Sequence, residues 1–275
     1  MISKKDLDYF LDALMFLTVL FFLALSANYG LEESRVSLEL NDKLSVLVKD
    51  PSVSDVMTFI EDKVYHIDAL KQKQQKYHLN SLTYFVLFLA FSASFLMYYI
   101  LIKSSRRRCK LFLIYVALLA LIAGVSLPAL SLNATKTFPL IGDITLYYNS
   151  KGVFSSIISL MQVDGAFFVG MLIIVFSLIF PLYKITVKLL SVFSDHFVVQ
   201  SLNDYSHRIG RWSMADVYVV AVLLSFFAIK YDKMIEAKIQ IGFHYFFVYA
   251  TLIVAMDFLF REIDRYMDKI QPCDC

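Results

Sequence analysis

The sequence predicts an all-α membrane protein that crosses the bilayer six times. Its 275 residues are 59% hydrophobic and only 18% charged, and they include 25 Phe and 17 Tyr. A soluble globule could not cover so much apolar surface with so few charged side chains. The apolar residues also fall into separate runs of roughly 20 residues, the length at which an α-helix spans the hydrocarbon core.

The basic residues predict the orientation of these spans. Arg106, Arg107 and Arg108 lie in a short loop between two apolar runs, within Lys103–Lys110. A dense basic cluster in a short loop is typical of the cytoplasmic side, so both termini are expected in the cytoplasm. The same arginines could hold anionic lipid headgroups, although a purely topogenic role is the simpler interpretation.

Residues 1–110 are predicted to form a two-span hairpin. The spans cover Tyr9–Ala27 and Leu82–Ile102. A signal peptide cleaved near Ala27 is the alternative to the first span, but the run is long for a signal peptide and Asp12 interrupts its start. Residues from about 28 to 81 carry interleaved charges of both signs and are predicted to form an extracytoplasmic domain.

Two local patterns divide this extracytoplasmic domain. Apolar residues alternate from Val36 to Val48 on either side of Asn41-Asp42, which predicts a short β-hairpin. Apolar residues at helical spacing from Val53 to Leu70 predict a helix that continues as a polar stalk into the second span. His66 and His78 lie on this segment without a metal-ligand spacing, so both are expected on the surface.

Residues 111–261 are predicted to form a four-span module. Its first span covers Leu111 to about Leu130 and is broken near Gly124 and Pro128. The loop that follows is expected to be extracytoplasmic, with two short strands between Thr137 and Tyr148, one of them at Ile144–Tyr148. A short helix then places one apolar face at the membrane surface, formed by Phe154, Ile157, Ile158 and Met161.

The remaining spans cover Ala166 to about Val187, Trp212–Ile229 and Gly242–Phe260, and a cytoplasmic tail covers residues 262–275. Pro181 is expected to kink the fourth span, because proline removes a hydrogen-bond donor inside a helix.

Three ionisable residues are predicted to lie at similar depth in the last three spans. Lys184, Asp216 and Asp257 would form a polar cluster near the cytoplasmic face. An ammonium between two carboxylates inside lipid would be either a structural charge pair or a proton- or ligand-binding site, and the sequence leaves both open. Four hydroxyl-bearing residues could line the same interior, namely Ser126, Ser177, Ser225 and Thr251.

Enzymatic classes fit the sequence poorly. A disulfide-generating enzyme needs cysteines on the oxidising side, whereas Cys109, Cys273 and Cys275 are all predicted to be cytoplasmic. An intramembrane hydrolase needs a nucleophile and a base at matched depth, and His244 lies near the face opposite the cluster. We expect no enzymatic activity, no cofactor, no metal site and no nucleic-acid partner.

One motif carries a resemblance to a known family. The residues Gly210, Arg211, Trp212, Ser213 and Met214, followed by Asp216, stand where a helix enters the membrane. Trp and Arg are typical of that interface. Together with Phe180-Pro181-Leu182-Tyr183-Lys184 upstream, this motif closely resembles the PqiA (paraquat-inducible protein A) family, which includes the LetA proteins.

The resemblance implies a bacterial inner-membrane protein that acts with an MCE-domain partner in phospholipid trafficking and envelope maintenance. It also implies a four-helix module similar to tetraspanins and claudins, formed by spans three to six, with a small extracytoplasmic β-sheet. A stand-alone ion-coupled carrier or a membrane scaffold is the alternative function, because the same lysine and aspartates would serve either.

The sequence departs from the family pattern in three respects. Many members have zinc ribbons built from paired Cys-x-x-Cys motifs and a second copy of the module, and this chain has neither. The family's Phe-Asp-Pro-Arg ending of the last span is replaced by Phe258-Leu259-Phe260-Arg261, so Asp257 would have to stand in for the missing carboxylate.

Overall fold

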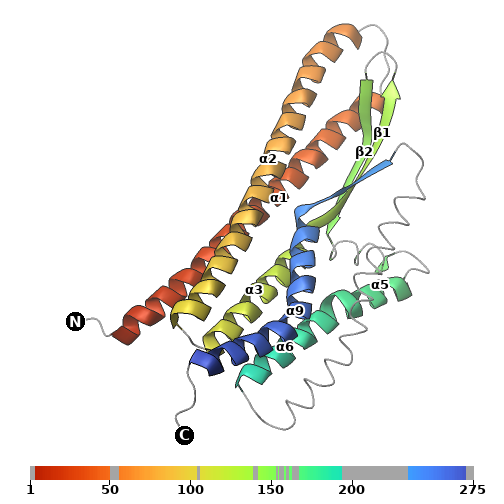
Figure 1. Cartoon of the computed structure of the whole chain (residues 1–275). Helices are drawn as coiled ribbons and strands as arrows, with labels where there is room; N and C mark the ends of the chain where they lie inside the picture. The colour runs from red at the N-terminus through yellow and green to blue at the C-terminus, as the bar shows by residue number, and fades with distance from the viewer. Residues whose placement is uncertain are drawn as a thin grey trace.

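The computed structural model describes residues 4–49, 56–103, 106–138, 142–152, 154, 158, 161–162, 167–193 and 235–270. Its longest elements are α1 (Lys4–Lys49) and α2 (Val56–Tyr98), which pack side by side as an antiparallel hairpin (Figure 1). A short π-helical segment, η1 (Tyr99–Lys103), follows α2. The predicted helical stalk into the second span is therefore confirmed, because one unbroken helix carries both.

The β-hairpin predicted between Val36 and Val48 is wrong, because these residues continue α1. Val36 and Ser37 are both buried while Leu38 is exposed, so burial does not alternate as it would in a strand. The segment has no glycine or proline to end a helix, and its commonest residue is leucine, a strong helix former. Once a helix has formed, each further residue extends it at little cost.

Three of the predicted spans are helices long and apolar enough to cross a membrane. They lie at Phe10–Glu39, Gln72–Leu101 and Arg107–Ser126, and a shorter apolar helix covers Ile241–Met256. The first helix continues well past Ala27, where the alternative cleavage site would lie. Span five, Trp212–Ile229, lies outside the described residues.

The fourth span is divided into three consecutive helical segments. These are α5 (Phe167–Ile174), the π-helical η2 (Val175–Ile179) and α6 (Phe180–Phe193). The widened segment ends at Ile179, two residues before Pro181, which cannot donate a backbone hydrogen bond. The kink predicted at Pro181 stays a prediction, and a π-helical segment lies on the N-terminal side of this residue.

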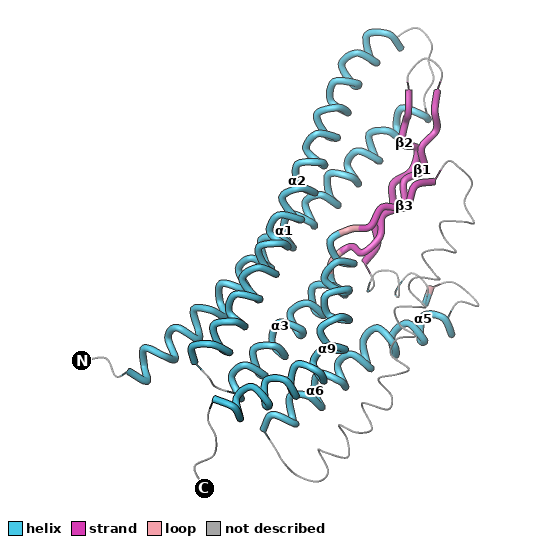
Figure 2. Tube along the Cα trace, in the orientation of Figure 1, coloured by secondary structure: helices cyan, strands magenta, loops and turns pink. Residues whose placement is uncertain are grey.

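A three-stranded antiparallel sheet lies beside the helical hairpin (Figure 2). The helix α3 (Arg106–Ser126) ends just before Pro128, which opens β1 (Pro128–Phe138). The order of the strands is β2-β1-β3, where β2 is Gly142–Gly152 and β3 is Ile235–Ile239. The strand expected at Ile144–Tyr148 lies within β2, which contacts α1.

The last helix, α9 (Ile241–Ile270), begins beside β1 and packs along α3. It continues beyond Phe260 to Ile270, so part of the predicted tail is helical. At Gly124 of α3, an added Cβ would lie 2.7 Å from the backbone nitrogen of Phe246, which shows how closely the two helices approach. Near the other end, the Lys110 ammonium lies 5.4 Å from the centre of the Phe260 ring.

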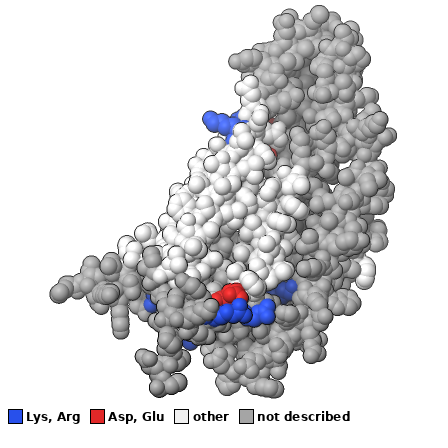
Figure 3. Space-filling model, viewed as in Figure 1, with Lys and Arg blue, Asp and Glu red and all other residues white. Residues whose placement is uncertain are grey.

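The core is centred on α3. In the most apolar 18-residue window of each candidate span, 61% of the residues are buried in α3, compared with 22% in α1 and 22% in α2. The apolar residues that α1 and α2 expose suit contact with lipid, and they include Leu14, Leu17, Phe21, Val86 and Met97. In one view of the surface, a broad white band without charged side chains lies between a group of acidic and basic side chains below it and a smaller charged group above it (Figure 3).

Candidate functional site

Polar residues join the helices of the apolar hairpin at two levels. At the end where α1 begins and α9 ends, Asp12 accepts two hydrogen bonds across helices. The Tyr99 hydroxyl donates to Asp12 Oδ1 at 2.9 Å, and Arg108 Nη1 donates to Asp12 Oδ2 at 2.8 Å. We call this group the basal clamp. It joins α1, η1 and α3 through one carboxylate.

A second clamp joins α1 and α2 farther from the chain ends. His78 Nδ1 lies 3.1 Å from Glu33 Oε1 and 3.2 Å from Oε2, and the Glu33 side chain is only 6% exposed. Next to it, Gln74 Nε2 donates to Ser37 Oγ at 2.7 Å, and that hydroxyl donates to the Glu33 carbonyl oxygen. We call Glu33 and His78 the distal clamp. The His78 side chain is itself 37% exposed, so it lies at the surface as predicted, but the prediction did not include its contact with the buried Glu33 carboxylate.

Between the clamps, two buried serines lock the helices together. Ser26 Oγ donates to the Ser81 carbonyl oxygen at 2.9 Å, and Ser81 Oγ donates to the Ser26 carbonyl oxygen at 3.2 Å. Tyr245 of α9 lies close to Ser26, and its buried hydroxyl has no hydrogen-bond partner among the described residues. Such hydroxyl contacts are typical of helix pairs in membranes.

The spacing of the clamps matches a bilayer. Asp12 and Glu33 are 21 positions apart on α1, and His78 of α2 and Tyr99 of η1 are also 21 positions apart. At 1.5 Å per residue this separation is about 31 Å, close to the hydrocarbon thickness of about 30 Å. Polar residues thus bracket the apolar part of the hairpin at both faces of the expected membrane.

Within the fourth span, α6 buries two lysines on one face. Lys184 is 6% exposed and Lys188 is 5% exposed. They stand four positions apart, so both side chains lie on the same side of the helix. Sequence reasoning singled out Lys184 but missed Lys188, because the predicted span ended at Val187. The spacing of four residues from Lys184, which places both lysines on one helix face, was the signal that could have identified Lys188.

The structure describes the other members of the predicted polar cluster only in part. Asp216 and Ser225 lie outside the described residues, and Asp257 lies on α9 with its side chain undescribed. Thr251 is exposed, and its hydroxyl donates to the Phe247 carbonyl oxygen of the same helix at 2.9 Å. The grouping of Lys184 with Asp216 and Asp257 therefore stays a prediction, and Thr251 lies on the outside.

The three arginines of the basic loop differ in their surroundings. Arg106 opens α3, Arg107 is exposed, and Arg108 is engaged by Asp12 in the basal clamp. Of these three, Arg108 is therefore the least suited to hold a lipid headgroup. Sequence reasoning missed this pairing because Asp12 and Arg108 are far apart in the chain.

The motif residues Gly210, Arg211, Trp212, Ser213 and Met214 lie outside the described residues, whereas Pro181 is buried on α6. Among the residues that the structure describes, no group of three His, Cys, Asp or Glu side chains could hold a metal ion.

Long apolar helices, polar clamps one bilayer thickness apart and buried lysines in a broken helix define a multi-pass membrane protein. The sequence profile of the family described as Paraquat-inducible protein A matches residues 111–266, more than half of the chain. The protein therefore belongs to the PqiA family. No curated protein and no solved structure matches it significantly.

Proposed function

We propose that this protein works in the bacterial inner membrane as a non-enzymatic component of a system that moves phospholipids between membranes together with an MCE-domain partner. Both termini lie in the cytoplasm in this proposal, and residues 111–261 form a tetraspanin-like four-span module. Membership of the PqiA family supports the proposal.

The observation that carries the proposal is the pair of buried lysines on α6. Ionisable groups inside a membrane are costly and usually mark a pathway for a substrate or an ion. Lys184 and Lys188 lie on α6, the helix that follows a π-helical segment, and such segments are often found at functional sites. Two ammonium groups on one face suit the phosphate of a lipid headgroup, or carboxylates that such a phosphate would displace.

The test replaces Lys184 with methionine in the full-length protein. Lipids and proteins that co-purify with the variant are then identified by mass spectrometry. We expect K184M to lose bound phospholipid while retaining its MCE-domain partner, and K184R to retain both. Thr186→Ala is the matched control, because Thr186 is exposed on α6 and its hydroxyl donates to its own helix. Unchanged lipid content in K184M would contradict the proposal.

An ion-coupled carrier is the alternative that the same lysines favour. Under that alternative, K184M in proteoliposomes would abolish an ion-dependent uptake while the co-purified lipid stayed the same. The absence of any MCE-domain protein from the purified complex would point the same way.

A further inference from the structure

We propose that the distal end of α2 holds the phosphate of a membrane phospholipid in a shallow groove. The groove has a volume of about 260 Å³ and is lined by Gln72, Gln75, Lys76, Leu79 and Asn80. It lies outside the residues that match the PqiA family, so this site does not depend on the proposed transport function.

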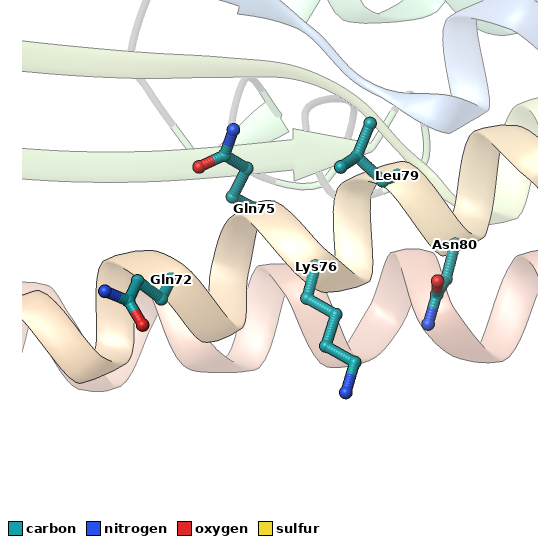
Figure 4. A pocket seen from close by; sticks show the side chains of 5 residues that line it. All are labelled: Gln72, Gln75, Lys76, Leu79 and Asn80. Carbon is teal, nitrogen blue, oxygen red and sulfur yellow. The ribbon is translucent and has the colours of Figure 1, made fainter.

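The groove runs between two ridges of side chains on one helix. Gln72, Lys76 and Asn80 repeat every fourth residue and form one ridge, and Gln75 and Leu79 form the other. Figure 4 shows Lys76 and Asn80 projecting to one side of α2, and Gln75 and Leu79 projecting to the other. A bound group would lie between an ammonium and three side-chain amides.

The position of the groove along α2 matches the headgroup layer. The distal clamp marks one edge of the apolar segment, at His78. Lys76 lies two residues beyond that edge, about 3 Å along the axis, and Gln72 lies about 9 Å beyond it. The layer between hydrocarbon and water is about 5–8 Å thick on each face. Lys76 therefore stands at the depth where lipid phosphates lie.

The chemistry of the groove suits a phosphate joined to an acyl chain. Lys76 is an exposed cation, and the amides of Gln72, Gln75 and Asn80 supply neutral donors. Leu79 is 56% exposed at the inner side of the groove, and Val86 and Met97 continue an exposed apolar surface down the helix. Binding pockets for whole small molecules measure about 300–1,000 Å³, so this smaller groove fits a headgroup whose tails remain in the bilayer.

Photocrosslinking of the full-length protein tests the site. A benzophenone amino acid replaces Leu79, the protein is placed in nanodiscs of phosphatidylethanolamine and phosphatidylglycerol, and lipid adducts are quantified by mass spectrometry. We expect K76Q to lower the adduct yield about fivefold, the effect of one lysine near a phosphate surface. K76R should retain the yield.

Lys73→Gln is the matched control. Lys73 is exposed on the same helix, so its replacement by glutamine removes the same charge as K76Q. Its ammonium lies over the Tyr77 ring, 5.7 Å from the ring centre, and Lys73 does not line the groove. K73Q should leave the adduct yield unchanged. An equal loss in K73Q and K76Q would overturn the site in favour of general charge attraction.

Further outcomes of the crosslinking experiment distinguish a phospholipid from other occupants of the groove. Millimolar inorganic phosphate should not reduce the adducts, because the acyl chains hold the lipid at the site; displacement by free phosphate would overturn the assignment to a lipid. Adducts to a second copy of the chain or to another protein would overturn it in favour of a helix-packing surface. Circular dichroism of each variant checks that the helices are intact.

Discussion

His78 Nδ1 lies 3.1 Å from Glu33 Oε1, although the two residues are 45 positions apart. This contact fixes how far α1 and α2 slide past one another at the distal level. The bond from Tyr99 to Asp12 fixes the same register at the basal level. Two polar contacts at this separation are hard to satisfy in any other register, so the clamps specify the antiparallel pairing of helices that are otherwise apolar.

Loss of His78 should destabilise the hairpin. In H78A the buried Glu33 carboxylate loses its cross-helix partner, and an unsatisfied buried acceptor costs about 1–3 kcal/mol. The measurement is the free energy of unfolding in detergent micelles. Glu32→Ala is the control, because Glu32 pairs with the exposed Arg35 of the same helix and such pairs contribute less than about 1 kcal/mol. Equal effects of the two variants would contradict the clamp.

Arg108 should matter more to stability than its neighbour Arg107. R108M removes the hydrogen bond from Arg108 to Asp12 and should cost about 1.5–3 kcal/mol, the usual contribution of a hydrogen bond to a charged group. R107M removes an exposed charge and should have little effect. The double variant D12N/R108M should recover part of the loss, since it leaves no carboxylate to satisfy. Thermal unfolding of the four proteins provides the comparison.

Gly124 should tolerate no side chain. A Cβ there would lie 2.7 Å from the backbone nitrogen of Phe246, so α3 and α9 would have to separate. We expect G124A to lose about 1–3 kcal/mol, the usual cost of overpacking.

Gly30 provides the contrasting case. Its added Cβ would meet Ile241 Cγ2 at 2.5 Å, which is a side-chain atom. Truncation of the Ile241 side chain in the double variant G30A/I241A should therefore relieve much of the clash. At Gly124 the two nearest atoms belong to the backbone, so no single side-chain truncation should restore the stability of G124A. Unfolding midpoints in detergent distinguish the two cases. Rescue of G124A by Phe246→Ala would show that the backbone contact is not limiting.

The serine lock should contribute a smaller amount. S26A/S81A removes two cross-helix hydrogen bonds, each of which should contribute about 0.6 kcal/mol inside a membrane. Ser94→Ala is the control, because Ser94 is exposed and donates to Ala90 of its own helix. The same unfolding assay should resolve the double variant from the control, and no difference between them would argue against the lock.

The family and the membrane class could be predicted from the sequence because both depend on local signals. The apolar runs of about 20 residues arise from a requirement that each span meets alone. The motif around Trp212 lies within a few consecutive residues, and the profile match over residues 111–266 agrees with the region predicted from it. Lys184 could be placed inside the protein because its neighbours on both sides are apolar.

The candidate site could be predicted only in part, because its contacts join distant segments. Asp12 looked like an interruption of the first span until the fold brought Arg108 and Tyr99 to it. Glu33 was assigned to a water-exposed domain because charges of both signs are interleaved between residues 28 and 81. The strand predicted from Val36 onward failed for a related reason, because the packing of α1 against α2 and β2 favours a continuous helix.

The sequence by itself determined that this chain must enter a membrane and which family it belongs to, because hydropathy and short motifs act residue by residue. Only the tertiary structure decided which polar groups are buried, what they pair with and how the two long helices are aligned. The physical reason is that a buried charge is stable only beside a partner, and the partner is supplied by the fold.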